Sequence, residues 1–104
     1  MGTGGFSLPP FQALLESDHD IRAVYTQPER IGRGHHRHFN PVKVLAEENN
    51  IPVRQPKRVN EPEVLDQLRS FDADLFIVAA YGQLLKPELL AIPRLGAFNL
   101  HASL

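Results

Sequence analysis

The sequence closes with a run that holds an asparagine and a histidine two positions apart, Asn99 and His101. We predict a strand over residues 97–101, in which side chains two residues apart point to the same side, near the strand's carboxyl end. An imidazole that titrates near neutrality can move protons, and a neighbouring carboxamide can donate a hydrogen bond to an oxygen that becomes negative during acyl transfer. The pair suits transfer of a formyl or similar group, although on spacing alone a turn asparagine beside an ordinary histidine is the commoner case.

A basic segment from residue 30 to residue 43 is the one concentrated positive field in the sequence. It holds no acidic residue, and its basic and imidazole side chains are Arg30, Arg33, His35, His36, Arg37, His38 and Lys43. The part up to Phe39 lacks apolar periodicity and is predicted to be a loop. Cations opposite phosphates give affinity for nucleic acid, so the segment is a candidate RNA contact; the alternative is a solvated loop without a partner. No metal site is predicted, because the three histidines lack a helix or strand that would fix their geometry.

Two turns hold further candidate residues. They are Tyr81, Gly82, Gln83 and Leu85 after one predicted strand, and Gly2 and Thr3 near the start. The backbone of the first turn can pair with the donors and acceptors of a heterocyclic ligand, and the alternative is a plain turn in which Gly82 supplies a positive φ. The second turn precedes a helix and resembles a phosphate-cradling turn, although a lone glycine cluster is weak support for one.

Helices and strands alternate along the chain and must position these residues. Apolar spacing and start signals predict helices over 8–17, 41–49, from a capping box at 60–63 to about 70, and over 87–92. Strands are predicted over 20–26, 74–80 and 97–101, with a short extended piece at 51–53. The alternation predicts an α/β fold, a Rossmann-like parallel sheet with flanking helices, in which ligands bind at the carboxyl ends of the strands.

One strand is missing from this arrangement. A glycine-rich turn of this kind normally follows a first strand in mid-sheet, yet Met1 alone precedes Gly2. We therefore expect residues 1–104 to be one partial domain that lacks the first strand and later strands. Poor solubility is expected for such a fragment, because the strands over 21–26 and 75–80 lose the partner that they are patterned to flank.

The composition is that of an ordinary globular protein. Hydrophobic residues make up 42% and charged residues 22%, which argues against a coiled coil or wholesale disorder. The net charge is -1, so attraction to nucleic acid must come from a local patch. The sequence has no cysteine, no signal peptide and no apolar run long enough to span a membrane, and we expect a cytoplasmic protein.

Several separated segments, in the same order, resemble the methionyl-tRNA formyltransferase family. They are Gly2-Thr3-x-x-Phe6, Thr26-Gln27-Pro28-Glu29-Arg30, Gly32-Arg33-Gly34, Pro41-Val42-Lys43-x-Leu45-Ala46, Ile51-Pro52-Val53-x-Gln55-Pro56, Ala80-Tyr81-Gly82-x-x-Leu85 and Asn99-x-His101-x-Ser103-Leu104. Together they cover essentially the whole chain and favour this family over glycinamide ribonucleotide formyltransferase, which shares the last segment. Three departures are His35-His36 in place of a basic pair, one residue fewer before Gly32, and Gly4-Gly5 where the family has proline and an acid.

The resemblance implies substrates and a role for each candidate residue. The family moves a formyl group from 10-formyltetrahydrofolate to the amino group of methionine on initiator tRNA, a step of translation initiation in bacteria and organelles. His101 would shuttle protons and Asn99 would polarise the formyl carbonyl. The folate would be held by Tyr81, Gly82, Gln83, Leu85 and Ser103, the tRNA by Arg30, Arg33, Arg37 and Lys43, and the acceptor substrate near Gly2 and Thr3. No metal and no membrane contact are expected from the sequence, and a monomer is expected for the full-length form.

The chain by itself is expected to be inactive. The family's triad ends with an aspartate beyond the segment that closes this sequence, and Asp72 and Asp74 are expected at the opposite end of the sheet from Asn99. Two alternatives stay open. One is a fragment of another 10-formyltetrahydrofolate-dependent formyltransferase or hydrolase, and the other is a non-catalytic nucleic-acid-binding module that uses only residues 30–43.

Overall fold

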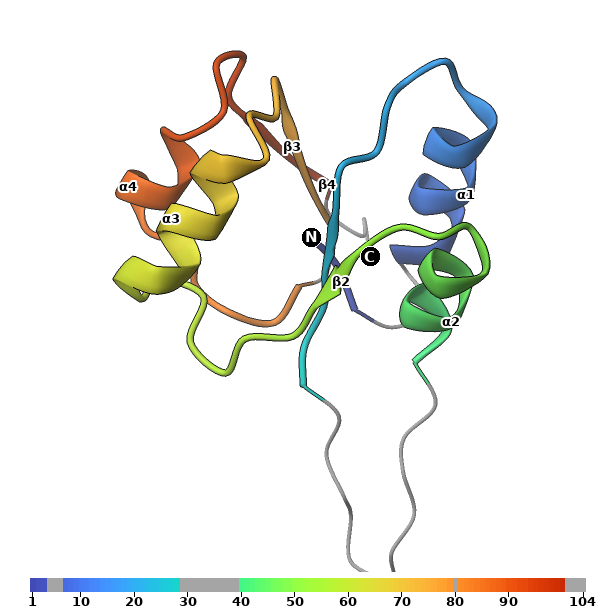
Figure 1. Ribbon diagram of the computed structural model, residues 1–104, viewed down its shortest axis with the longest axis horizontal. Helices are drawn as coiled ribbons and strands as arrows, with labels where there is room; N and C mark the ends of the chain where they lie inside the picture. The colour runs from blue at the N-terminus through green and yellow to red at the C-terminus, as the bar shows by residue number, and fades with distance from the viewer. Residues whose placement is uncertain (4–6, 29–39, 80, 101–104) are drawn as a thin grey trace, which may run out of the picture.

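The computed structural model describes residues 1–3, 7–28, 40–79 and 81–100. Its elements, in chain order, are α1 (Leu8–Glu16), β1 (Val24–Tyr25), α2 (Pro41–Glu48), β2 (Val53–Arg54), α3 (Pro62–Ser70), β3 (Phe76–Ala79), α4 (Pro87–Leu90) and β4 (Ala97–Leu100). The predicted α/β alternation is confirmed, and each helix lies within two residues of its expected bounds (Figure 1). None of the described helices is long and apolar enough to cross a membrane.

Proline in the first turn marks the start of all four described helices. It suits this position because its missing N–H would have no partner in the helix and its φ is already close to helical. The start of α2 is also capped as predicted, since the Asn40 side chain accepts a hydrogen bond from the Lys43 backbone N–H at 3.2 Å. Local sequence thus explains where these helices begin.

The predicted capping box at α3 is wrong. The residue before the helix is Glu61, and its side chain makes no capping hydrogen bond. Asn60 binds a different part of the chain: its amide donates to the Leu84 carbonyl at 2.7 Å and its oxygen accepts from the Lys86 N–H at 3.0 Å. A tertiary contact therefore uses the side chain that the local pattern assigned to the helix.

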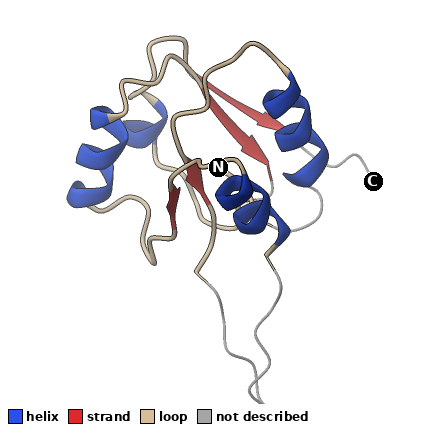
Figure 2. Ribbon diagram, turned by 45° about the vertical axis from the view of Figure 1, so that its right-hand side comes forward, coloured by secondary structure: helices blue, strands red, loops and turns tan. Residues whose placement is uncertain are grey.

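The strands form two parallel pairs, and the start of the chain lies between them. β1 pairs with β2 in the register Val24↔Val53, and β3 pairs with β4 in the register Phe76↔Ala97. Gly2 N–H donates to the Tyr25 carbonyl at 2.9 Å, and Ala79 N–H donates to the Met1 carbonyl at 2.8 Å. The order across the molecule is therefore β2, β1, Met1–Gly2, β3, β4, as Figure 2 shows with the N-terminus between the two strand pairs.

Helices cover both faces of these strands, α1 and α2 on one side and α3 and α4 on the other (Figure 1). Alternate residues of β1 serve the two layers, because Val24 packs with Phe11 and Ala46, whereas Tyr25 packs with Leu65 and other side chains of the α3 layer. Only these two residues of the predicted strand over 20–26 are in strand conformation. The core on either side of β1 is therefore built on a short strand.

Candidate functional site

Polar residues follow the strands where their carboxyl ends meet. Thr3 follows the Met1–Gly2 segment, Thr26 and Gln27 follow β1, Gln55 follows β2, and the 81–85 loop follows β3. We call this the carboxyl edge. In parallel α/β sheets this is where ligands bind, because helix starts and loops converge there.

A pair of threonine hydroxyls joins four segments at the carboxyl edge. The Oγ1 atoms of Thr3 and Thr26 are 3.2 Å apart. Thr3 Oγ1 accepts the Gln27 N–H at 2.9 Å and lies 3.3 Å from the Tyr81 carbonyl, to which it donates. Thr26 Oγ1 accepts from Asn40 Nδ2 at 2.9 Å. Thr26 is fully buried, so its hydroxyl needs these partners.

A second set of hydrogen bonds comes from three glutamines, Gln27, Gln55 and Gln83, which we call the glutamine cluster. Gln83 Nε2 donates to Gln27 Oε1 at 2.9 Å and to the Pro56 carbonyl at 3.1 Å, and Gln83 Oε1 accepts the Val59 N–H at 2.9 Å. Gln55 Nε2 donates to the Gln27 carbonyl at 2.9 Å. The cluster fixes the 81–85 loop against the segments that follow β1 and β2.

The predicted folate residues of the 81–85 loop differ in what they expose. Tyr81 is 2% exposed and its ring lies in the core, where burial and the neighbouring Tyr25 raise the pKa of its hydroxyl to about 12. The Gln83 side chain is engaged in the glutamine cluster, and Leu85 is packed against the core. Gly82 is exposed, so the loop offers its backbone more than its side chains.

Gly82 adopts a positive φ of 92°, as the plain-turn alternative from the sequence requires. A Cβ built at this position would lie 2.8 Å from Gln27 Nε2, which is too close for a real contact. Glycine therefore serves both the turn and the close approach of Gln27. The loop backbone at Gly82 is therefore accessible on one side and contacted by the Gln27 side-chain amide on the other.

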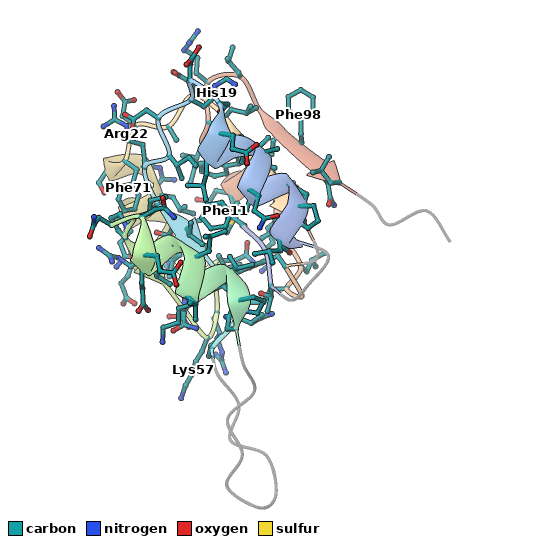
Figure 3. All side chains as sticks on the ribbon, turned by 90° about the vertical axis from the view of Figure 1, so that its right-hand side faces the viewer. Phe11, His19, Arg22, Lys57, Phe71 and Phe98 are labelled. Atoms are coloured by element: carbon teal, nitrogen blue, oxygen red, sulfur yellow. The ribbon has the colours of Figure 1, made fainter. Side chains whose placement is uncertain are left out.

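Asn99 lies on β4 and is exposed, in register with Val78 of β3. It therefore lies beside the last residues of the strand that leads into the 81–85 loop. His101 and Ser103 lie outside the described residues. The neighbouring Phe98 is 59% exposed, and its side chain projects from β4 away from the helices (Figure 3). Among the described residues β4 is thus an edge strand with open side chains.

Of the predicted tRNA contacts, Arg30, Arg33 and Arg37 lie outside the described residues. Lys43 lies in the first turn of α2, half-buried beside the Asn40 cap. The described residues on the two sides of the basic segment belong to the carboxyl edge, since the Gln27 N–H and the Asn40 amide both bind the threonine pair. The sequence analysis missed this role of Thr26, Gln27, Asn40 and Gln55. Their shared position after strands or at a helix start is the signal that points to it.

Acidic residues are placed elsewhere. Asp74 lies two residues before β3, at the amino end as predicted, where it pairs with Arg94 at 3.2 Å. Asp72 lies two residues earlier, before the same strand. Within residues 1–3, 7–28, 40–79 and 81–100, no three histidine, cysteine or acidic side chains are grouped so that they could hold a metal ion.

Comparison with known proteins gives one consistent result. The sequence profile of the formyl transferase family, described as "Formyl transferase", matches residues 2–104. The chain is 50% identical over 105 residues to a methionyl-tRNA formyltransferase of Geobacter metallireducens, covering all of this chain and 34% of the relative. Identity is 45% to that of Hydrogenovibrio crunogenus, over 99% of this chain and 33% of the relative, and 47% to that of Clostridium perfringens, over all of this chain and 34% of the relative. The chain thus spans about a third of the length of the curated relatives that it matches.

Proposed function

The chain belongs to the formyl transferase family, and from that premise we propose that it forms part of a methionyl-tRNA formyltransferase. In this proposal residues 1–104 are one partial formyltransferase domain of an enzyme that uses 10-formyltetrahydrofolate to formylate methionine on initiator tRNA, as a monomer in the cytoplasm. The observation that carries the proposal is identity of 45 to 50% over essentially the whole chain to proteins that bear that name. The arrangement of polar groups at the carboxyl edge supports it.

Asn99 and His101 are proposed to act on the formyl group. The amine nitrogen of methionine attacks the formyl carbon, the bond from that carbon to N10 of the folate breaks, and the proton lost by the amine ends on N10. His101 carries this proton, and the Asn99 carboxamide donates a hydrogen bond to the formyl oxygen as it becomes negative. The exposure of Asn99 next to the end of β3 supports this role, because an incoming carbonyl can reach it.

The folate is proposed to bind along the 81–85 loop and Ser103. Backbone groups of Tyr81, Gly82 and Gln83 pair with the heterocycle, while the side chains of Tyr81, Gln83 and Leu85 hold the loop from behind. Support comes from the glutamine cluster, because a loop that is already fixed loses less conformational entropy when a ligand binds. Polar backbone groups held in place in this way are typical of small-molecule sites.

The tRNA is proposed to contact Arg30, Arg33, Arg37 and Lys43, with the acceptor end near Gly2 and Thr3. Cations opposite phosphates make such binding fall steeply with salt. The Thr3 hydroxyl already binds Gln27 and Tyr81, so Gly2 and Thr3 would act through their position rather than through free side chains. We expect replacement of the three arginines by alanine to weaken RNA binding and reduce its dependence on salt.

A chimaera tests the proposed activity, with a relative supplying the two-thirds of its own length that this chain does not match. This chain replaces the matching residues of the Geobacter metallireducens relative, and formylation of methionyl-tRNA is measured. We expect the chimaera to transfer the formyl group. The variants Asn99→Asp and His101→Ala should abolish this transfer. The control His19→Ala should retain it, because this side chain is exposed on the loop before β1. The isolated chain is expected to show none.

The proposal fails if the chimaera has the circular dichroism and melting temperature of its parent yet transfers no formyl group. It also fails if the Asn99 and His101 variants keep full activity. Transfer of the formyl group to another amine in place of methionyl-tRNA would support a different formyl transferase.

A further inference from the structure

Gln27 presents a side-chain amide to the 81–85 loop, and the glutamine cluster fixes which way this amide points. Val59 N–H can only donate, so the atom that it meets at 2.9 Å is Gln83 Oε1. Gln83 Nε2 then lies on the other side, where it donates to Gln27 Oε1 at 2.9 Å. The Pro56 carbonyl, which accepts from the same Nε2 at 3.1 Å, requires the same direction. Gln27 Nε2, which can only donate, is therefore the open end of this chain of hydrogen bonds.

Gln27 Nε2 lies beside Gly82, an exposed residue of the loop. It is 2.8 Å from the point where a Cβ of residue 82 would be, so it occupies the space of the absent side chain. The described residues provide no hydrogen-bond acceptor for this Nε2. Among their side chains the one polar atom that is sealed from solvent without a partner is Tyr81 Oη, so Gln27 Nε2 stays accessible. The loop thus has an open side-chain donor next to its exposed backbone.

The Gln27 amide is already held in place before a ligand arrives. Its backbone N–H donates to Thr3 Oγ1 at 2.9 Å, its carbonyl accepts from Gln55 Nε2 at 2.9 Å, and its Oε1 accepts from Gln83. Little rotamer freedom is therefore left to lose when Nε2 donates to a ligand. Gln27 is only partly exposed, so a ligand that displaces water from Nε2 must offer an acceptor or leave the donor unpaired. The amide thus selects ligands that carry an acceptor at this point.

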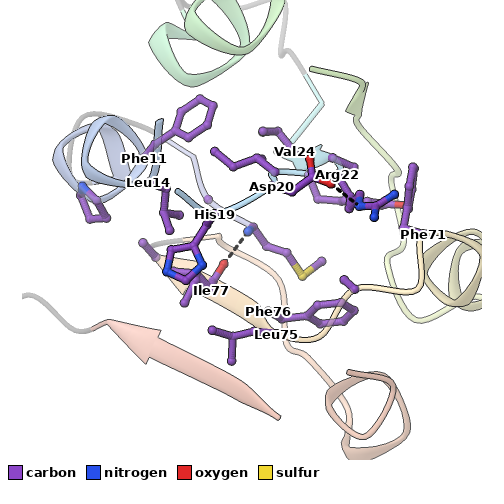
Figure 4. Close-up of a pocket in the computed structure, with 18 of the residues that line it drawn as sticks. Phe11, Leu14, His19, Asp20, Arg22, Val24, Phe71, Leu75, Phe76 and Ile77 are labelled. Carbon is purple, nitrogen blue, oxygen red and sulfur yellow. Dashed lines mark hydrogen bonds and ion pairs between the residues drawn. The ribbon is translucent and has the colours of Figure 1, made fainter. Parts of the chain in front are cut away.

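A cavity between β1 and β3 is a separate feature and does not compete for this ligand. Figure 4 shows it as an open space, and its volume is about 390 Å³. Residues 19–25 and 71–77 line it together with part of α1, and none of the three glutamines does. In the expected sheet this is the position of the missing first strand. A ligand at the carboxyl edge therefore meets the glutamine cluster.

We propose that Gln27 Nε2 donates a hydrogen bond to the heterocycle of the folate, at a carbonyl oxygen or ring nitrogen beside Gly82. This inference rests on the proposed function, which gives the 81–85 loop to the folate and assigns no part to Gln27. The loop backbone pairs with the heterocycle, and Gln27 recognises one further acceptor on it. Its contact is with the heterocycle because the formyl group is assigned to Asn99, which lies on a different strand, β4. Gln27 is thus a specificity-determining residue for the formyl donor.

Two substitutions in the chimaera remove the donor and differ in their other effects. Gln27→Glu keeps an oxygen that accepts from Gln83 Nε2, whereas Gln27→Met is uncharged and gives up that hydrogen bond as well. Binding of 10-formyltetrahydrofolate and of tetrahydrofolate is measured by calorimetry. Each variant should bind both compounds about tenfold more weakly, because the lost contact is to the heterocycle that the two share. The control Gln12→Glu, which adds the same charge at an exposed position of α1, should bind both as the parent does.

Steady-state kinetics give a second readout on the same proteins. The KM for 10-formyltetrahydrofolate should rise about tenfold in both variants, while kcat and the KM for methionyl-tRNA change less than about twofold. A residue that served only the fold would raise both KM values and lower the melting temperature of Gln27→Glu. The split between the two substrates therefore separates a folate contact from a structural role.

The inference is overturned if both Gln27 variants bind tetrahydrofolate as tightly as the parent. It is also overturned if only Gln27→Glu binds more weakly, because the added charge would then be the cause, or if the loss is confined to 10-formyltetrahydrofolate. Failure of the proposed function is distinct from these results. A chimaera that transfers no formyl group to methionyl-tRNA, yet binds tetrahydrofolate and loses that binding in both variants, upholds Gln27 as a folate contact. A chimaera that binds neither folate overturns both proposals.

Discussion

Replacing Gln83 by leucine tests whether the glutamine cluster holds the 81–85 loop. Leucine has a similar size but removes all polar atoms of the side chain. Three hydrogen bonds are lost, those from Nε2 to Gln27 Oε1 and to the Pro56 carbonyl and that from Val59 N–H to Oε1. Val59 is fully buried, so water does not easily replace its lost acceptor.

The expected loss of stability follows from these contacts. At about 1 kcal/mol for each net hydrogen bond, the free energy of unfolding should fall by about 3 kcal/mol, with the unsatisfied Val59 N–H as the largest part. With a urea dependence of about 2 kcal/mol per molar, the unfolding midpoint should fall by about 1.5 M. This is a large share of the stability of a small domain.

Urea unfolding followed by tyrosine fluorescence and by circular dichroism measures the change. Tyrosine is a suitable probe because the chain has no tryptophan and both tyrosines, Tyr25 and Tyr81, are buried near the affected loop. The matched control is Gln12→Leu, an exposed glutamine on α1 for which the described residues provide no side-chain hydrogen bond. It should change the free energy of unfolding by less than about 0.5 kcal/mol.

Gln83→Glu separates hydrogen bonding from packing. The carboxylate still accepts the Val59 N–H, but it faces two carbonyl oxygens that previously accepted from Nε2. The folded state therefore favours the protonated acid and raises its pKa, so this variant should gain stability relative to the wild type as the pH falls toward about 4.3, the ordinary pKa of glutamate. If Gln83→Leu unfolds at the same urea concentration as the Gln12 control, the glutamine cluster does not hold the loop.

Three further predictions concern other parts of the molecule. The Met1 amine has its pKa lowered to about 5 in the folded state, so the native state binds fewer protons than the unfolded state between pH 5 and 8. Stability should then rise over this range by up to about 4 kcal/mol and fall as the pH drops; amine acetylation should abolish this dependence in urea titrations. Gly82→Ala should lower the free energy of unfolding by about 1 kcal/mol more than Gly96→Ala does. Both glycines have a positive φ, but only a Cβ at position 82 meets a side chain. Equal urea midpoints for the two variants would contradict this. Leu89→Ala, at a fully buried position, should lower stability by about 2 to 5 kcal/mol, whereas Leu84→Ala should stay within about 0.5 kcal/mol, which thermal melts can compare.

The sequence alone determined the helices, the strand β3 and the positive φ that is open to Gly82. These features depend on neighbours along the chain: proline and the Asn40 cap start helices, an apolar run makes β3, and glycine tolerates the positive φ. Such signals act over a few residues and need no tertiary contact. The α/β class then follows from the order of the elements.

Only the tertiary structure decided which polar side chains act together at the carboxyl edge. The hydrogen bonds of Gln83 join it to residues 24 to 56 positions away. Asn60 does not cap the helix as predicted but binds a residue 24 positions further along the chain. Strand length was also decided this way, because β1 is limited to Val24 and Tyr25, the two residues that pair with Val53 and Arg54 of β2. Hydrogen bonds between distant segments depend on how the elements pack, which no local pattern encodes.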